Sequence, residues 1–342
     1  MRTTSHTFLL FGLLMAASAF ILPLWASPVP PLDLNALTSQ ADLIAVGRVT
    51  EVRQEGSTTL QIFGTALVAH RFLARLDPDR VLKGKKESGS LEFTYALPDA
   101  PVGYAGIGEG EYAVFFLRDG PRGLEILDPY HPFVVAAPGA GLPNGSLVDR
   151  VLGEVAQVFD SPFSTPDYLL RATIVLGTVK GPLATDALKR AARIARGNAQ
   201  IWAIAALLER GDLSFLPILR EIALSPKNDV DDGSMMRLGA SLNYVKDPKA
   251  IPILAELLGS PNEYVRRGAA AALRNTRDEA AIKPLTQALS DRDSEVRYYA
   301  VVGLGEIAGQ NEWTPSIDNF NKNEEKFLKH WREWAKENKL TQ

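Results

Sequence analysis

The chain has 342 residues, of which 46% are hydrophobic and 23% are charged, as is typical of folded globular proteins. Its length exceeds the usual single-domain range, so we expect two folded units. The formal net charge of −3 argues against nucleic acid as a partner, and the absence of cysteine excludes disulfides, thiolate catalysis and thiolate metal sites.

The N-terminal residues have the pattern of a secretory signal. An apolar run extends from Phe8 to Leu24, and Pro23 breaks the helix shortly before Ala26, a small residue suited to cleavage. We therefore predict a signal peptide over residues 1–26 and export to the periplasm or the extracellular space. The alternative is an uncleaved membrane anchor, because the run is close to the ~20 residues that span a bilayer. Cleavage is favoured since no basic stop-transfer cluster follows.

Residues 32–137 have the alternation and the turn chemistry of a small β module. Five segments are predicted as strands: Leu43–Val52, Thr65–Val81, Leu91–Leu97, Tyr112–Leu117 and Leu124–Leu127. Asp119-Gly120-Pro121 is predicted to form a hairpin turn after the fourth strand. We expect a small antiparallel barrel or sandwich.

The order of these segments resembles the netrin-type OB barrel of the tissue inhibitors of metalloproteinases. The resemblance is carried by the lead-in Ala41–Val49, by Asp79–Gly84 closing the long second strand, and by Gly110–Leu117 as the fourth. It implies an OB-like β-barrel for this part of the chain. Those inhibitors clamp a protease metal with an N-terminal cysteine, which this chain lacks, so the inhibitory mechanism does not carry over.

A turn-rich stretch, residues 138–146, is predicted to link the β module to a helical region over residues 147–310. Two matches recur there at a spacing of 31 residues (281 − 250 and 296 − 265): Ala250–Leu258 with Ala281–Leu289, and Val265-Arg266 with Val296-Arg297. One helix pair cannot bury its apolar stripe alone, so stacked neighbours are required.

This region resembles HEAT repeats of the short kind, including those named after the phycobilisome lyases. The resemblance rests on Asp247-Pro248 before a first helix and on Val265-Arg266 at the start of the following second helix. It implies an α-α HEAT-type solenoid that binds a protein or peptide, in which Arg266 and Arg297 bond the acidic turn of a neighbouring repeat. The same likeness leaves a lyase or maturation factor as an alternative function.

The last segment, residues 316–340, is predicted to be a helix that caps the solenoid. Phe327, Trp331 and Trp334 recur at helical spacing on one face. An exposed final repeat needs such a cover, and a ligand or membrane contact is the alternative role of the stripe.

The sequence contains no catalytic, cofactor-binding or metal-binding constellation that we could assign. No spacing places two of the histidines, His6, His70, His131 and His330, on one helical face. The glycine-rich stretch Gly103–Gly110 precedes a strand instead of joining a strand to a helix N-terminus. We therefore expect a non-enzymatic protein without a cofactor.

The candidate binding residues are Arg267, Arg274 and Tyr298. Arg267 and Arg274 lie on one face of a second helix, and Tyr298 holds the position of Arg267 one repeat later. Arginine and tyrosine are enriched at binding hot spots, so we expect a concave recognition surface there; ordinary surface residues are the alternative. The positions expected to be buried between repeats are Val265, Ala269, Leu273, Val296, Ala300 and Leu304.

Together these features favour an exported, non-catalytic scaffold that binds a protein or peptide of unknown identity. A membrane-tethered scaffold, held by an uncleaved N-terminal helix, is the further alternative.

We predict that the mature protein begins near Ser27 and is found outside the cytoplasm, because the apolar run ends in a helix breaker and a small residue. N-terminal sequencing of protein purified from the cell envelope and from the medium measures the start. Recovery of chains with an intact Met1 would contradict cleavage.

Overall fold

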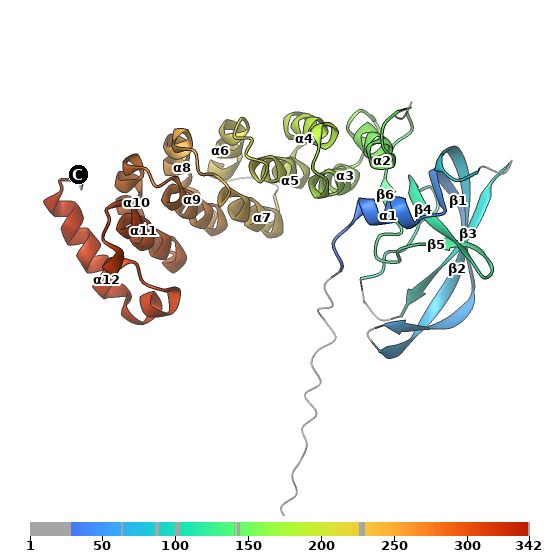
Figure 1. Ribbon diagram of the computed structural model, residues 1–342, viewed down its shortest axis with the longest axis horizontal. Coiled ribbons are helices and arrows are strands. Elements are labelled where there is room, and N and C mark those ends of the chain that lie inside the picture. The colour runs from blue at the N-terminus through green and yellow to red at the C-terminus, as the bar shows by residue number, and fades with distance from the viewer. Residues whose placement is uncertain are drawn as a thin grey trace, which may run out of the picture.

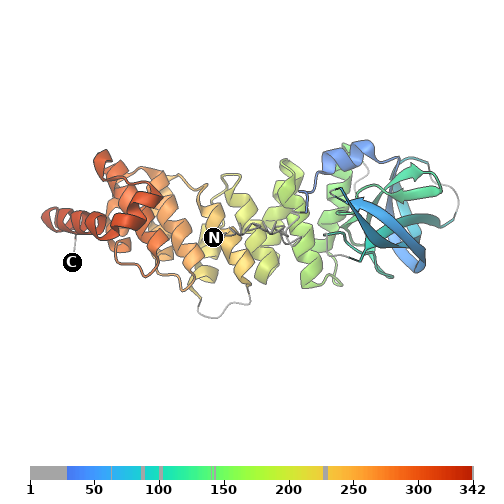
Figure 2. The same cartoon turned by 90° about the horizontal axis from the view of Figure 1, so that it is seen from below.

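The computed structural model describes residues 29–62, 64–85, 89–99, 103–139, 141, 144–225 and 230–340. The predicted signal peptide lies outside these residues. A short helix, α1 (Leu34–Gln40), opens the described chain, a sheet follows, and the remainder is helical. Figures 1 and 2 show an elongated molecule with the sheet at one end and the last helix, α12, at the other.

The sheet contains six strands: β1 (Leu43–Ile62), β2 (Thr65–Lys83), β3 (Leu91–Pro98), β4 (Tyr112–Gly120), β5 (Gly123–Ile126) and β6 (Phe133–Val135). Their order is β1-β2-β3-β5-β4-β6, and β1 also pairs with β4. The pairings that run from β1 through β2, β3, β5 and β4 therefore return to β1. Among these strands β3 and β5 pair in parallel, and the other pairs are antiparallel.

Several features of the sheet differ from the prediction. β1 continues beyond Val52 to Ile62. Its polar second half pairs with β2 along its whole length, and the last pair is Ile62 with Thr65. Cross-strand hydrogen bonds, not an apolar face, hold this ribbon, so hydrophobic alternation does not reveal it. The helix α1 and the three-residue strand β6 were also not predicted. The hairpin turn between β4 and β5 is confirmed, since Gly120 pairs with Gly123.

The helical part is made of the following helices: α2 (Leu147–Ala156), α3 (Pro166–Thr178), α4 (Pro182–Ile194), α5 (Gly197–Leu208), α6 (Leu216–Leu224), α7 (Asp232–Leu242), α8 (Ile251–Leu257), α9 (Glu263–Thr276), α10 (Ile282–Ala288), α11 (Ser294–Ile307) and α12 (Ile317–Glu337). The helices α3, α5, α7, α9 and α11 pack one on the next in a single layer. The helices α4, α6, α8 and α10 lie along the other side of this row (Figure 1).

The second helices of the repeats begin in the same way. Side chains of Asp231, Asn262 and Asp293 accept hydrogen bonds from backbone N–H groups in the first turns of α7, α9 and α11. Such caps satisfy amide donors that the helix itself leaves free. Each second helix therefore starts at a fixed residue after its short loop, which keeps the layer in register.

A single cluster of buried apolar side chains connects the sheet to the helices. It extends from Leu34 in α1 through Val114 in β4 to Trp331 in α12. The six positions expected between repeats, Val265, Ala269, Leu273, Val296, Ala300 and Leu304, are all fully buried. That expectation is confirmed. A second cluster, which includes Phe93 and Phe115, fills the interior of the sheet.

The joint between sheet and helices is polar as well as apolar. Arg80 in β2 donates from Nε to Glu154 Oε1 in α2 at 2.8 Å, and Glu154 is only 1% exposed. This hydrogen bond raises the pKa of Arg80 above its usual range although burial opposes the charge. Arg150 in α2 donates to the carbonyl of Leu82 at 2.9 Å. The helix α2 is thus attached to the strand β2.

The helices α7 and α9 approach so closely that only glycine fits at their contact. A Cβ atom added to Gly268 would collide with the backbone carbonyl of Gly239, and one added to Gly239 would collide with the carbonyl of Tyr264. Backbone atoms cannot move aside as a flexible side chain can. These two glycines therefore set the distance between the two helices.

We predict that Gly268→Ala destabilises the protein by about 1–3 kcal/mol or more, because the new methyl group overpacks a backbone contact. The control is Gly177→Ala in α3, where a Cβ would meet its nearest neighbour, Ala206 Cβ, at 3.7 Å. That variant should be neutral or slightly stabilised, since alanine is the better helix former. Urea unfolding of both variants measures the difference, and equal stabilities would show that the helices separate at little cost.

Candidate functional site

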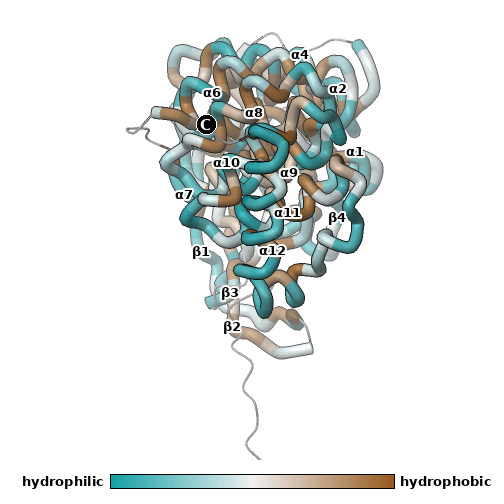
Figure 3. The backbone as a smooth tube through the Cα atoms, turned by 90° about the vertical axis from the view of Figure 1, so that its left-hand side faces the viewer, coloured by the Kyte–Doolittle hydropathy of each residue, from teal (hydrophilic) through white to brown (hydrophobic). Residues whose placement is uncertain are grey.

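The candidate site is the exposed side of the layer formed by α3, α5, α7, α9 and α11, called here the second-helix face. Figure 1 shows that the β module and α12 both extend from the ends of the row toward the side on which this layer lies. In Figure 3, seen from the C-terminal end, the turns of α12 are mostly hydrophilic on the outside. The second-helix face is thus flanked at both ends.

The predicted residues Arg267, Arg274 and Tyr298 reach from one helix to the next. Arg267 binds Asp293 in a fork, with Nε at 3.0 Å from Oδ1 and Nη2 at 2.7 Å from Oδ2. Arg274 donates from Nε to Glu306 at 2.8 Å. The ring of Tyr298 packs against Tyr299 and Phe320.

Both guanidinium side chains stay about one third exposed, at 32% for Arg267 and 31% for Arg274. Their hydrogen-bonding capacity is already directed at carboxylates of the protein. The structure therefore gives these arginines contacts that connect adjacent second helices.

Of the two arginines expected to bond the acidic turn of a neighbouring repeat, Arg266 does so and Arg297 does not. Arg266 donates to Asp291 at 2.9 Å, in the turn before α11, which confirms the predicted contact with the neighbouring repeat. Arg297 donates to Glu324 of α12 at 2.5 Å and to the carbonyl of Asp291 at 2.7 Å. For Arg297 the helix α12 takes the place of a following repeat.

The carboxylate of Asp293 is stabilised in its charged form. Its hydrogen bond with Arg267 lowers the pKa most, and the backbone N–H groups of Val296 and Glu295 lower it further, whereas burial acts in the opposite direction. Asp293 therefore serves both as the cap of α11 and as the anchor of Arg267. Its negative charge is needed for both contacts.

An apolar hollow that the sequence did not predict lies on the second-helix face. It has a volume of about 580 Å³ and is lined mainly by carbon atoms of α3, α5 and α7: Leu170, Trp202, Asp231, Gly233, Ser234, Met236, Arg237 and Ala240. We call it the helix hollow. Met236 is 54% exposed there.

The walls of the helix hollow are held in place by polar contacts. Trp202 donates from its indole N–H to Ser234 Oγ at 3.1 Å. The guanidinium of Arg237 lies over the Trp202 ring at 5.4 Å and binds Glu209 at 2.7 Å. The sequence contains one signal for this site. Met236 precedes Arg267 by 31 residues (267 − 236), and Arg267 precedes Tyr298 by the same number, so the three residues hold corresponding positions in successive repeats.

The histidines of the described chain have local partners. His131 lies 3.0 Å from Asp128, and His330 stacks on Trp313 at 3.6 Å. Burial lowers the pKa of His330.

Within the described ranges no group of three His, Cys, Asp or Glu side chains could hold a metal ion. No helix of the described chain is long and apolar enough to cross a membrane.

Comparison with known families finds HEAT repeats over residues 234–305. This stretch extends from α7 into α11, and it includes Met236 and the three predicted binding residues. The helical part therefore contains HEAT-type repeats. No curated protein matches the chain.

We predict that the contribution of Arg267 to stability depends on pH. Asp293 has a lowered pKa in the folded protein, so the stability from its pairing is present above the pKa of the unfolded chain, about 3.9, and is lost as pH falls through the folded value. The difference in unfolding free energy between the wild type and Arg267→Gln should thus be larger at neutral pH than in strong acid.

Chemical denaturation at both pH values measures this difference. Arg196→Gln is the control, because Arg196 bonds only to the carbonyls of Arg193 and Ala195 and has no carboxylate partner in the described chain. A penalty for Arg267→Gln that is the same at both pH values would rule out the ion pair as its source.

Proposed function

We propose that this protein is an exported, non-catalytic scaffold that binds a protein or peptide partner on its second-helix face. The helix hollow carries this proposal, because it is an open, almost wholly apolar depression that lies at the N-terminal end of the HEAT repeats. Repeats of this kind use extended concave surfaces for binding.

An apolar anchor from the partner suits this face better than a charged one. Three arginines, Arg237, Arg267 and Arg274, already pair with carboxylates of the protein. A partner charge would have to compete with those ion pairs. An aliphatic or aromatic side chain seated against Met236 and Trp202 would instead remove apolar surface from water, which is how interface hot spots gain most of their energy.

Methionine adds adaptability to such a surface. Its unbranched thioether side chain changes rotamer easily and fits anchors of different shape. Met236 thus favours recognition of an apolar side chain without strict selection for one residue type.

The finer fold assignments belong to the same proposal. The circuit of strand pairings that returns to β1 supports an OB-like barrel over residues 32–137. The serial packing of α3 to α11 supports a solenoid over residues 147–310, joined by the linker 138–146. Burial of Phe327 and Trp331 supports a capping role for residues 316–340. Export rests on the sequence of residues 1–26.

We predict that Met236→Gln weakens binding of the partner by about tenfold, because burying a methionine is worth about 1.5–3 kcal/mol and 1.4 kcal/mol corresponds to tenfold. The partner is obtained by affinity capture from the envelope fraction and then measured as a purified protein by biolayer interferometry. Thermal melting should be unchanged, since the side chain is mostly exposed.

The matched control is Ile194→Gln. Ile194 is an apolar residue of similar exposure, 50%, but it ends α4, outside the second-helix layer. Equal binding by both variants and the wild type would show that the partner does not use the helix hollow.

A further inference from the structure

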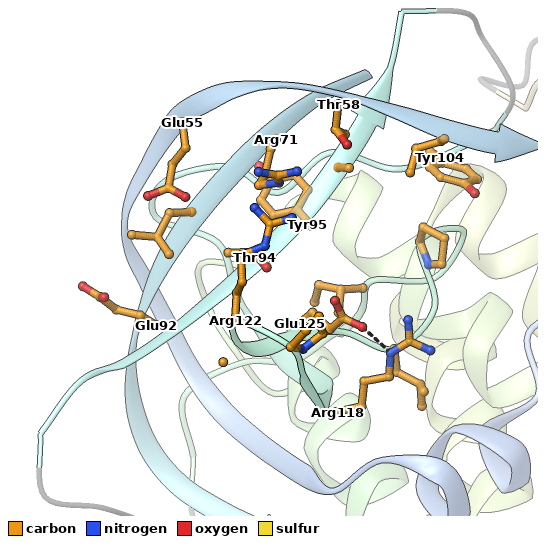
Figure 4. A pocket seen from close by; sticks show the side chains of 18 of the residues that line it. Glu55, Thr58, Arg71, Glu92, Thr94, Tyr95, Tyr104, Arg118, Arg122 and Glu125 are labelled. Carbon is orange, nitrogen blue, oxygen red and sulfur yellow. Dashed lines mark hydrogen bonds and ion pairs between the residues drawn. The ribbon is translucent and has the colours of Figure 1, made fainter. Parts of the chain in front are cut away.

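A second hollow lies on the β module, well away from the HEAT stretch. It has a volume of about 640 Å³ and is bounded by β1, β2 and β3 and by the turn between β4 and β5. We call it the sheet hollow (Figure 4). Along β3 the residues Glu92, Thr94 and Ala96 line it together with Tyr95, which also packs in the core of the sheet beside Phe93. The sheet hollow therefore borders both the exposed residues of these strands and the core of the sheet.

The acidic side chains of the sheet hollow are already neutralised. Glu125 pairs with Arg118 at 2.7 Å, as the dashed line in Figure 4 shows. Glu92 pairs at 2.8 Å with Arg75, which also pairs with Glu51 at 2.7 Å, and Glu55 lies 3.5 Å from Arg53. Each of these three carboxylates therefore has a cation beside it.

Two arginines of the sheet hollow remain without a carboxylate. Arg71 rises from β2 and Arg122 stands in the turn between β4 and β5, and neither has an ion-pair partner in the part of the chain that the structure describes. Four arginines and three glutamates line the hollow, so its positive side chains exceed its negative ones by one. This excess contrasts with the chain as a whole, whose net charge is −3.

Apolar and aromatic groups share the lining with the two arginines. Leu60 and Leu73 lie on the strand face, and Tyr104 forms part of the wall. The ring of Tyr104 is fixed edge-on against Tyr130, with 4.7 Å between ring centroids. An occupant that touches the whole hollow must therefore combine negative groups with a carbon skeleton.

We propose that the sheet hollow binds an acidic peptide segment, with carboxylates of the peptide on Arg71 and Arg122. A guanidinium presents a planar fork that matches a carboxylate with two parallel hydrogen bonds. The volume is within the range of pockets that enclose small ligands. The hollow therefore accommodates a few residues of an extended peptide and not a folded domain. A lone inorganic anion would satisfy one arginine and leave the apolar strand face uncovered.

The test uses the full chain and a fluorescently labelled, glutamate-rich peptide, with the glutamine-rich peptide of equal length as the neutral comparison. Fluorescence anisotropy should show binding of the acidic peptide and little binding of the neutral one. The variant Arg71→Gln/Arg122→Gln should lose at least about tenfold in affinity, since the loss of one hydrogen bond to a charged group weakens binding by about tenfold or more.

The control variant, Lys246→Gln/Lys249→Gln, removes the same number of positive charges from exposed positions of the helical part. It should bind the acidic peptide as the wild type does. Thermal melting of both variants verifies that the β module is folded.

Three results would overturn the proposal: no binding of the acidic peptide, equal loss in both double variants, or displacement of the peptide by inorganic phosphate at similar concentration. The second would indicate attraction by net charge alone. The third would indicate a simple anion site. Because Met236→Gln leaves the sheet hollow intact, its peptide binding should be unchanged, so failure at one hollow is distinguishable from failure at the other.

Discussion

Each helix pair in this chain has an apolar side that it cannot cover by itself, and the architecture follows from covering it. The buried side of α9, with Val265, Ala269 and Leu273, is shielded because α7 and α11 lie on either side. At the end of the row α12 covers the apolar side of the last helix pair, and its side chains Phe320 and Trp331 are fully buried. At the beginning, α2 packs against β2 and β6. The sheet therefore closes one end of the helical core and α12 closes the other.

The repeat could be derived from the sequence because its signals are local. The 31-residue spacing placed the buried positions of α9 and α11 correctly, since the same residue types must recur wherever the same contact recurs. The contact of Arg266 with the neighbouring acidic turn was implied by the resemblance to HEAT repeats and not by the spacing. The extension of β1 to Ile62 was not, because its polar half gains stability from hydrogen bonds to β2 that leave no hydrophobic pattern.

The candidate site was less accessible to such reasoning than the fold. Arg267 and Arg274 were expected on one face of a second helix, but their carboxylate partners, Asp293 and Glu306, lie at the next second helix and depend on how closely α9 and α11 pack. The helix hollow combines side chains from α3, α5 and α7, and its depth depends on how those helices sit beside one another. Spacing within one helix carries no information on that depth. In the sheet hollow, likewise, the unpaired state of Arg71 and Arg122 emerges only once every nearby glutamate has been assigned a partner.

The ion pair between Arg80 and Glu154 bears on how the two hollows are connected within the molecule. Together with the shared apolar core, it joins the β module to α2, where Glu154 is almost fully buried. The connection between the two hollows therefore runs through packed structure. For a partner that carries both an apolar anchor and an acidic segment, occupation of one hollow makes the second contact intramolecular, at an effective concentration fixed by the partner's own linker. Avidity of this kind depends on linker length, and a partner too short to reach both hollows gains nothing from the second.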